Sequence, residues 1–451
     1  MKLGQVIMVT IKRLGINGEG VGYFKKKVVF IDGALPGEVV VAEIKRIEKN
    51  LAYADLIRVK EKSPHRVKPA CPVYKECGGC QLQHMSYEGQ LDSKRELVVE
   101  AFSRYLTSAR PPEIRHTIGM EHPWSYRNKA QLQVGYANGK VVTGLYAAGT
   151  HQLIDISDCP IQHPKTNEMI QTTRDVLNQL GIPIYNERKR SGVVRTVVAR
   201  VGFETEGTQL TIVTAVKEIP KIKELILELR HRMPFLQSIM QNINDKKTSL
   251  IFGDQTNLLW GSGTIDERLG EVQFSLSPRA FFQLNPEQTI KLYNAVKEAS
   301  ALTGKELLVD AYCGVGTIGL WLAPDAKEVR GIEVIPEAVE DANRNAQLSG
   351  IRNARFYTGK AEQLLPQWVK QGLRPDVVVV DPPRTGCDEQ LLKTLLSVKP
   401  KRIVYVSCNP STLAKDCNLL AKQYDIHWVQ PVDMFPQTAH VESVTLMTLK
   451  T

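Results

Sequence analysis

The stretch from Leu307 to Thr317, which reads LLVDAYCGVGT, decides the fold. Its apolar half predicts a short buried strand, and an apolar-periodic helix is expected from Ile318 onward. A glycine-containing turn between strand and helix lets backbone approach a ligand at the carboxyl end of a doubly wound sheet. From Ser277 onward strand and helix patterns alternate, which predicts a mostly parallel α/β sheet.

A carboxylate ends the next predicted strand. Val329–Ile332 runs into Glu333, which lies 23 positions after Asp310. A carboxylate about 20 residues on is placed to accept both hydroxyls of a ribose. Because no phosphate-cradling lysine of the P-loop kind is present, the pattern favours a cofactor with ribose but without pyrophosphate, such as S-adenosylmethionine. A glycine turn in an unrelated α/β domain is the alternative.

Two further strand ends bear reactive side chains. Val377–Val380 runs into Asp381, and Arg402–Ser407 runs into Cys408. Continuous apolar runs are typical of buried parallel strands, so both polar residues are expected at the ligand crevice. An oxygen or nitrogen methyl acceptor already has a lone pair, whereas a pyrimidine C5 becomes nucleophilic only after a thiolate adds to C6. Cys408 therefore predicts carbon methylation by covalent catalysis.

Three other cysteines share this region. Cys387 is the rival nucleophile, Cys313 lies in the glycine turn, and Cys417 lies mid-helix. Buried cysteine is also a common core residue. The position directly after a strand favours Cys408.

The covalent route also needs a general base to remove the C5 proton, a step worth roughly 10² to 10⁴ in rate. His440 and Glu442, in a predicted loop before the last strand at 444–449, are the two candidates. Either is also explained as a surface loop residue.

The N-terminal stretch is basic and strand-rich. Residues 1–68 carry 14 Lys and Arg against 7 Asp and Glu, so +7 of the formal charge of +10 lies there. Val- and Ile-rich runs separated by turn signals predict a small closed β-barrel of the oligonucleotide-binding type; they span 5–12, 27–31, 38–45 and 52–59. Tyr23–Lys27 suits a nucleic-acid-binding face, although a solvated lysine loop explains it equally well.

The whole chain is expected to be a multidomain α/β protein. Its 451 residues correspond to roughly three domains of about 150 residues each. The predicted boundaries are 1–62 for the barrel, 63–275 for an irregular central α+β domain and 276–451 for the Rossmann-like domain. The Pro-rich segment 104–124 is interpreted as connecting chain.

Four cysteines lie outside the Rossmann-like region. Cys71, Cys77 and Cys80 form a C-x5-C-x2-C pattern, and Cys159 supplies a fourth thiolate. Four soft ligands in a loop-rich region fit either a tetrahedral zinc or a [4Fe–4S] cluster, with His84 as a substitute ligand in the zinc case. The remaining alternative is that these cysteines are inert thiols. The presence of three cysteines within ten residues argues against it.

Some classes are excluded. The first residues lack the apolar core and cleavage site of a signal peptide, and no uncharged apolar stretch approaches the ~18 residues that cross a bilayer. The protein is therefore expected to be cytoplasmic, with its eight cysteines as thiols, metal ligands or catalysts rather than disulfides. No obligate protein partner is evident, and the basic charge favours a polyanion.

Nearly end to end, the chain resembles the RNA uracil-5 methyltransferase family, specifically its 23S ribosomal RNA branch. The motifs that carry the resemblance are Phe281–Asn285, Asp310–Gly316, Asp381–Arg384, Ser407–Pro410 and His440–Glu442. The resemblance implies S-adenosylmethionine-dependent methylation of uridine C5 in 23S ribosomal RNA, at one or more sites. It also implies that the barrel is a TRAM domain, an RNA-binding module.

The same resemblance implies roles for single residues. Cys408 would add to uracil C6 and Glu442 would remove the C5 proton. The cofactor and uracil pockets would be lined by Gln283, Tyr312, Glu333 and Asp381, with Asp381 bonding the base. Thr317 stands where some relatives have Asn, and either side chain can bond the cofactor. The [4Fe–4S] cluster would be held by Cys71, Cys77, Cys80 and Cys159.

Three rival classes fit parts of the pattern. Radical methylthiotransferases also join such a barrel to a cluster, but they use C-x3-C-x2-C. An RNA cytosine-5 methyltransferase shares cofactor and thiolate, and a non-catalytic ribosome-binding factor shares the fold. For an enzyme acting on RNA the uridine must be flipped out of its stack, and residues 127–129 and 188–190 are candidate phosphate contacts.

Overall fold

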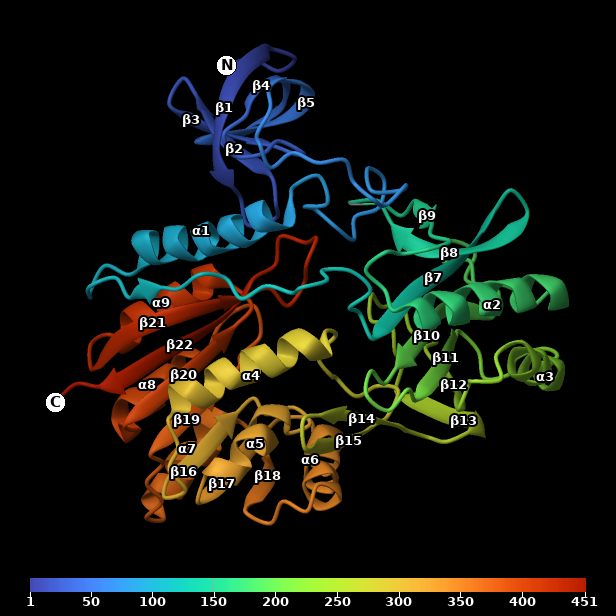
Figure 1. Cartoon of the computed structure of the whole chain (residues 1–451). Coiled ribbons are helices and arrows are strands. Elements are labelled where there is room, and N and C mark those ends of the chain that lie inside the picture. Colours follow the sequence, from blue (N-terminus) through green and yellow to red (C-terminus); the bar gives the residue numbers. More distant parts are fainter. Residues whose placement is uncertain (148) are drawn as a thin grey trace.

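The computed structural model describes residues 1–147 and 149–451, which form three packed parts (Figure 1). A barrel lies at one end, a helix-covered sheet on one side and a larger α/β sheet on the other. No helix among the described residues combines the length and apolar character that a bilayer crossing demands.

The N-terminal part is a closed barrel with strand order β1-β2-β3-β5-β4, which confirms the predicted barrel. Ile7, Val9 and Ile11 alternate along the first strand and enter the barrel core. The strands are β1 (Val6–Leu14), β2 (Gly20–Phe24), β3 (Lys27–Ile31), β4 (Val39–Ile47) and β5 (Leu51–Glu61).

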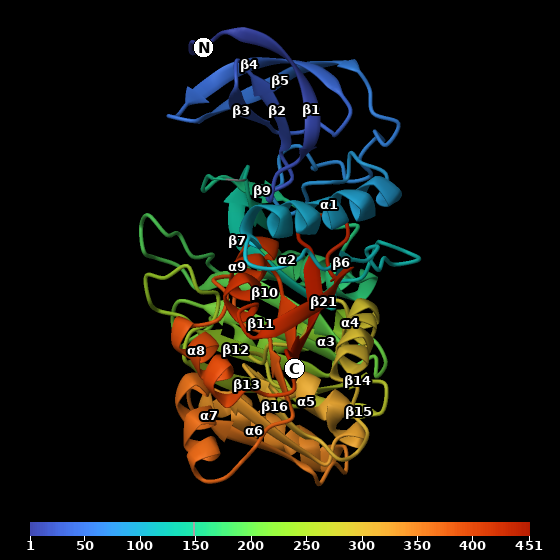
Figure 2. The same ribbon diagram turned by 90° about the vertical axis from the view of Figure 1, so that its left-hand side faces the viewer.

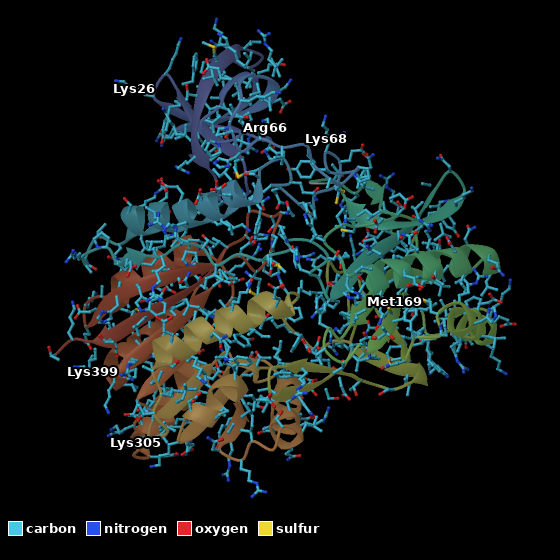
Figure 3. All side chains as sticks on the ribbon, viewed as in Figure 1. Lys26, Arg66, Lys68, Met169, Lys305 and Lys399 are labelled. Atoms are coloured by element: carbon cyan, nitrogen blue, oxygen red, sulfur yellow. The ribbon has the colours of Figure 1, made fainter. Side chains whose placement is uncertain are left out.

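Strand β2 does not follow from the sequence pattern, because Gly20 and Gly22 interrupt its apolar alternation. Glycine is needed there for close approach, since a Cβ on Gly22 would lie 2.2 Å from Val9 Cγ1. The chain then reverses through Lys25 and Lys26, whose φ values of 49° and 66° are left-handed. Lys26 therefore stands at the outer tip of a hairpin (Figure 3).

The central part is a sheet with strand order β13-β12-β11-β10-β7-β8-β9. Helices α2 (Pro164–Leu180) and α3 (Ile222–Arg232) pack against it, and their side chains share one core with Val197 and Ile212. The strands are β7 (Lys129–Ala137), β8 (Lys140–Tyr146), β9 (Leu153–Asp155), β10 (Val194–Val201), β11 (Thr208–Thr214), β12 (Ser238–Ile243) and β13 (Gln255–Gly261). A hairpin, β14 (Ile265–Leu269) and β15 (Val272–Leu276), leads into the third part.

The C-terminal part is a doubly wound sheet with strand order β18-β17-β16-β19-β20-β22-β21-β6. Its own strands are β16 (Leu307–Ala311), β17 (Glu328–Glu333), β18 (Ala354–Thr358), β19 (Val377–Val380), β20 (Arg402–Ser407), β21 (Tyr424–Val432) and β22 (Glu442–Leu449). The helices are α4 (Pro286–Ser300), α5 (Thr317–Leu322), α6 (Pro336–Leu348), α7 (Ala361–Lys370), α8 (Glu389–Val398) and α9 (Pro410–Leu420), with the 3-10 turn η1 (Ala323–Asp325). Leu308 and Val309 enter separate cores on the two faces. The order reverses between β16 and β19, which is where such sheets bind ligands, and this confirms the Rossmann-like prediction.

Two elements that precede the central sheet in sequence pack on the C-terminal sheet (Figure 2). Helix α1 (Tyr87–Tyr105) contributes Val98 and Phe102 to the same core as Val429. Strand β6 (Glu113–Ile114) pairs in parallel with β21. The segment interpreted as connecting chain thus contains an edge strand, whose two residues are too short a run to produce a strand pattern.

Candidate functional site

The carboxyl ends of β16 and β17 meet at the glycine turn. Tyr312, Gly314 and Gly316 all have left-handed backbone, with φ values of 66°, 54° and 82°. The Gly314 N–H donates to Glu333 Oε2 at 3.1 Å, so the carboxylate at the end of β17 closes against the turn. Beneath it Asp310 accepts from Gly319 N at 2.8 Å, and burial raises the Asp310 pKa to about 8. The predicted ribose-binding carboxylate and the turn are therefore brought together.

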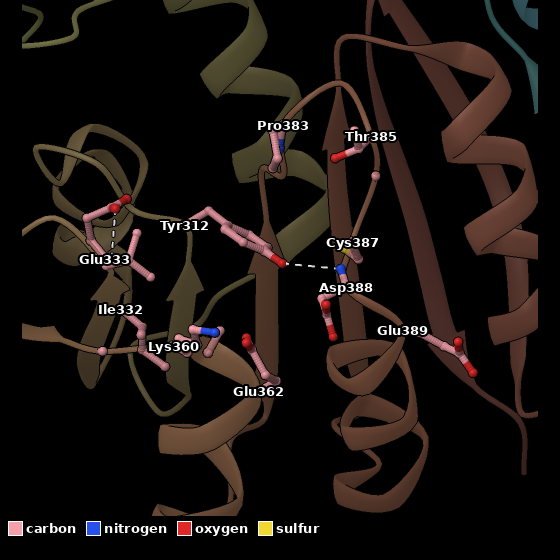
Figure 4. A pocket seen from close by; sticks show the side chains of 14 residues that line it. Tyr312, Ile332, Glu333, Lys360, Glu362, Pro383, Thr385, Cys387, Asp388 and Glu389 are labelled. Carbon is pink, nitrogen blue, oxygen red and sulfur yellow. Dashed lines mark hydrogen bonds between the residues drawn. The ribbon is translucent and has the colours of Figure 1, made fainter.

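A cavity of about 470 Å³ opens beside this turn (Figure 4). Its volume suits a nucleoside-sized ligand. Asp388 N donates to the Tyr312 hydroxyl at 3.5 Å, which joins the turn to the loop after β19. The cavity is lined by Tyr312, Ile332, Glu333, Val334, residues 359–362, Pro383 and residues 385–389. Of the predicted cofactor residues, Tyr312 and Glu333 line it, whereas Gln283, Thr317 and Asp381 do not.

Cys408, directly after β20, and Glu442, the first residue of β22, lie opposite each other where these neighbouring strands meet. Ser407 pairs with Ser443 in the antiparallel β20–β22 register, so the next position along each strand places Cys408 across from Glu442. Burial raises the pKa of the Cys408 thiol to about 11, and the negative charges of Glu442 and Asp381 add to this shift. The Arg384 guanidinium acts in the opposite direction and favours the thiolate.

Both carboxyl groups beside Cys408 titrate near neutral pH. Burial raises the pKa of Glu442 to about 8, with the charge of Asp381 adding to the shift. Burial likewise raises the pKa of Asp381 to about 7. A carboxylate poised near the working pH is suited to general base catalysis, and such shifts concentrate at functional sites.

His440 is held differently. Arg384 Nη2 lies 3.2 Å from each of its ring nitrogens, and the ring meets Phe435 edge-on. Burial and the charge of Arg384 lower the pKa of His440 to about 4, so the ring is neutral at pH 7. Of the two predicted bases, Glu442 is therefore the one that faces Cys408 with a near-neutral pKa.

The rival cysteines occupy other surroundings. Cys387 lines the cavity, where burial raises its pKa far above the ordinary range, and its N–H donates to Asp416 Oδ2 at 2.9 Å. Cys313 and Cys417 are buried, and burial raises the pKa of each well above normal. Among the four, Cys408 is the cysteine whose pKa responds to Glu442 and to Arg384.

Thr317 and Gln283 are each joined by a hydrogen bond to another part of the fold. The fully buried Tyr293 of α4 donates its hydroxyl to Thr317 Oγ1 at 2.7 Å. The main-chain oxygen of Gln283 accepts from Asn128 Nδ2 at 3.0 Å. The segment that carries Gln283 is thus fixed to the central sheet.

Three cations lie on that sheet next to this segment. Burial, together with the charges of Arg200 and Arg127, lowers the pKa of Lys129 to about 7. Arg200 donates to the main-chain oxygens of Ser277 and Ala280 at 3.1 and 2.7 Å. Such concentrated positive charge suits a polyanion. By contrast, residues 188–190 form an exposed loop.

The four cysteines outside the Rossmann-like part are neighbours. Cys80 and Cys159 pack half-buried against Tyr126, and burial raises the pKa of Cys80 to about 12, with Cys159 and Cys77 adding to the shift. Gly79 N donates to Cys77 Sγ at 3.4 Å. However, within residues 1–147 and 149–451 no group of three or more His, Cys, Asp and Glu side chains is arranged to hold a metal ion. The predicted metal site is therefore not confirmed.

His84, the substitute ligand considered for zinc, is engaged elsewhere. Its Nδ1 lies 2.5 Å from the Tyr74 hydroxyl, which also donates to the Gln81 oxygen at 2.6 Å. Burial lowers the pKa of His84 to about 4.

Sequence reasoning missed several residues of the site. Lys360 and Glu362 follow β18 and line the cavity. The expectation that polar residues after a parallel strand lie at the ligand crevice would also have predicted these two. Asp416 holds the loop between β19 and α8 by accepting from Cys387 N and from the Tyr405 hydroxyl at 2.9 and 2.6 Å. No local signal marks that residue, because it lies mid-helix.

Comparison with known proteins identifies both ends of the chain. Residues 1–57 match the TRAM domain, and residues 255–450 match the family described as tRNA (Uracil-5-)-methyltransferase. A relative in Bacillus anthracis, named "Uncharacterized RNA methyltransferase", is 59% identical over 450 residues, which cover 100% of this chain and 98% of the relative. One of the same name in Enterococcus faecalis is 50% identical over 451 residues, covering 100% and 99%.

A solved structure resembles the whole chain as well. It is the Pyrococcus abyssi tRNA (uracil-54, C5)-methyltransferase in complex with S-adenosyl-L-homocysteine, with a TM-score of 0.77 and 28% identity. The similarity covers 98% of this chain and 100% of that one.

Proposed function

Since the chain belongs to the RNA uracil-5-methyltransferase family, with a TRAM barrel and an S-adenosylmethionine-dependent methyltransferase fold, we propose that it methylates uridine C5 in 23S ribosomal RNA. The single observation that carries the chemistry is Cys408 lying opposite Glu442 at the crevice of the doubly wound sheet. The ribosomal assignment rests on the motif resemblance of the chain.

In the proposed reaction, Cys408 Sγ adds to uracil C6, and the electrons of the C5–C6 double bond move toward C5. The thiol must first lose its proton. The charge of Arg384 favours the thiolate, whereas ionised Asp381 and Glu442 oppose it. Because the pKa values of the two carboxyls are about 7 and 8, both are partly protonated near neutral pH, which lessens their opposition.

S-adenosylmethionine supplies the methyl group when it is bound at the glycine turn and the adjacent cavity. Gln283, Tyr312, Thr317 and Glu333 would hold it, and Asp381 would bond the uracil beside it. Glu442 then accepts the C5 proton, the double bond re-forms, and the bond from Cys408 to C6 breaks. Glu442 can perform this step because its pKa lies near the working pH.

The RNA is proposed to cross from the basic barrel to Arg127 and Lys129 beside the central sheet. The target uridine has to leave its stack to reach Cys408. The tip lysines of the β2–β3 hairpin and the central-sheet cations supply phosphate contacts on either side.

We also propose that Cys71, Cys77, Cys80 and Cys159 hold a [4Fe–4S] cluster with a structural role. Support comes from Cys71, Cys80 and Cys159, whose pKa values are raised by burial and by the charges of neighbouring cysteines. The Gly79 N–H also donates to Cys77 Sγ, a bond typical around cluster sulfurs. Iron and sulfide analysis of anaerobically purified protein tests it. Four iron atoms per chain are expected, and stoichiometric zinc without iron contradicts the proposal.

Mapping 5-methyluridine in ribosomal and transfer RNA, with and without the protein in cells, tests the substrate. We expect loss of the modification from 23S RNA when the protein is removed, and its return with the wild-type chain but not with Cys408→Ala. Loss from transfer RNA alone would favour the competing substrate, which the matched family name and the Pyrococcus abyssi enzyme support.

A further inference from the structure

The loop of residues 433–441, which joins β21 to β22 and leads directly into Glu442, contains a strained and buried residue. Gln437 has φ +70° and a side chain that is 3% exposed. A left-handed backbone is unfavourable for a residue other than glycine, because its Cβ crowds the following carbonyl oxygen. Such a conformation persists only when the surroundings hold it firmly.

The surroundings of Gln437 come from the segment directly after the third cysteine. Gln81 N and Leu82 N both donate to the Gln437 main-chain oxygen, at 3.1 and 2.9 Å. Gln437 N donates to Gln90 Oε1 at 2.9 Å, and Gln90 Nε2 donates back to Gln437 Oε1 at 3.0 Å. Ala439 N donates to Gln81 Oε1 at 3.4 Å. Gln437 therefore joins the main chain directly after Cys80 to the loop that leads into Glu442.

Two further contacts hold the loop of residues 433–441 against the rest of the protein. The Tyr126 hydroxyl donates to the Pro436 oxygen at 3.0 Å, and Tyr126 is the buried side chain against which Cys80 and Cys159 pack. From the barrel, Gly18 comes so close that a Cβ there would lie 2.9 Å from Gln81 Cβ and 3.3 Å from Ala439 Cβ. All three parts of the protein thus meet behind the loop that ends at Glu442.

We propose that Gln437 is a positioning residue through which the order of the three-cysteine loop, residues 71–85, sets the place of Glu442. The part of this inference that concerns the base rests on the proposed function. Loosening the three-cysteine loop lets residues 433–441 relax, so removal of the C5 proton slows. Addition of Cys408 to the uracil is less affected, because Cys408 directly follows a different strand, β20.

Hydrogen–deuterium exchange of the full-length protein as purified tests the coupling without any assay of activity. Cys77→Ser loosens the three-cysteine loop, and Gln347→Ala, an exposed change on α6, is the matched control. We expect faster exchange in peptides covering 433–441 for Cys77→Ser and unchanged exchange there for the control. Faster exchange confined to residues 71–85 would overturn the proposal.

A second variant separates positioning from folding. Gln437→Gly introduces a residue that adopts positive φ readily, so the backbone conformation is retained. The change removes the side-chain hydrogen bonds of Gln437 to Gln90 and to Pro123. We expect turnover on uridine RNA to fall by about tenfold or more, within the range that a general base contributes, while a covalent adduct accumulates in denaturing gels. Turnover equal to wild type, or loss of adduct and turnover together, would contradict the positioning role.

5-Fluorouridine RNA separates the two proposals. Its adduct cannot be resolved by proton removal, so we expect Gln437→Gly to form it within about twofold of the wild-type rate. If the wild-type protein forms no such adduct, the covalent function fails, whereas the exchange result still decides the coupling.

Discussion

Lys94 and Asp433 form an ion pair whose side chains are 1% and 0% exposed, with Nζ 2.5 Å from Oδ1. Lys94 Nζ also donates to the Phe435 oxygen at 3.1 Å. Lys94 belongs to α1, and Asp433 opens the loop that ends at Glu442. The ion pair thus fixes the start of the loop of residues 433–441, and the hydrogen bonds of Gln437 fix its middle.

Breaking this pair from one side leaves a carboxylate buried without its counter-charge. We expect Lys94→Met to lower the free energy of unfolding by about 3–5 kcal/mol, measured by urea denaturation. Adding Asp433→Asn removes the unpaired buried charge, so the double variant is expected to recover much of the lost free energy of unfolding. The exposed pair Lys393–Glu389 is the control, and Lys393→Met is expected to cost less than about 1 kcal/mol. Equal losses for Lys94→Met and Lys393→Met would show that burial of the first pair is unimportant.

Replacement of the predicted nucleophile separates it from its rival. Cys408→Ala is expected to abolish methyl transfer to ribosomal RNA while leaving the thermal unfolding midpoint nearly unchanged, because the thiol is only half-buried. Cys387→Ala serves as the control and should retain transfer. Loss of transfer in Cys387→Ala but not in Cys408→Ala would identify Cys387, in the cavity wall, as the nucleophile.

Replacement of the predicted base affects a later step. Glu442→Gln keeps the shape of the side chain but cannot take the C5 proton, so a covalent RNA–protein adduct is expected to form and to decay slowly. The adduct is measured on denaturing gels over time. His440→Gln is the control and should release product at close to the wild-type rate, because His440 is neutral and faces Arg384. Rapid release from Glu442→Gln would assign the base elsewhere.

The pH dependence follows from the direction of two pKa shifts. Glu442 must be ionised to accept a proton, and its pKa of about 8 means that the ionised fraction grows as pH rises from 6 to 9. Cys408, with a pKa of about 11, also becomes more reactive with rising pH. Product formation under single-turnover conditions should therefore increase across this range. A rate that falls between pH 6 and 8 would contradict both assignments.

Salt dependence reports the phosphate contacts. We expect Lys129→Ala to reduce the slope of log affinity against log salt by roughly 0.7 for single-stranded RNA, measured by filter binding. Arg188→Ala, on the exposed loop, is the matched control. The same reduction in both variants would mean that the cations beside Gln283 have no special part in binding.

Much of the fold followed from the sequence because apolar runs and the turns after them are local signals. The strands that end at Glu333, Asp381 and Cys408 were predicted in this way, and the barrel strands alternate as expected. Strand β2 was missed because its glycines serve barrel closure rather than alternation, and β6 because two residues form no pattern.

The candidate site was predictable at the strand ends and less so elsewhere. The pairing of Cys408 with Glu442 depends on the register of β20 against β22, which the sequence alone does not specify. Lys94, Gln90 and Asp416 lie within helices and act on residues far along the chain, so no local pattern marks them. The spacing of the four cysteines indicates a metal site and the resemblance favours iron–sulfur over zinc; both stay predictions.

The position of α1 and β6 has a consequence for biosynthesis. Both are translated before the central sheet, yet their hydrophobic partners on β21 and β22 leave the ribosome last. Apolar side chains such as Val98 and Phe102 stay uncovered until translation is nearly complete, so premature termination yields a nascent chain prone to aggregation. A recombinant fragment that starts at residue 276 would lack α1 and β6, and it would therefore expose the edge of β21.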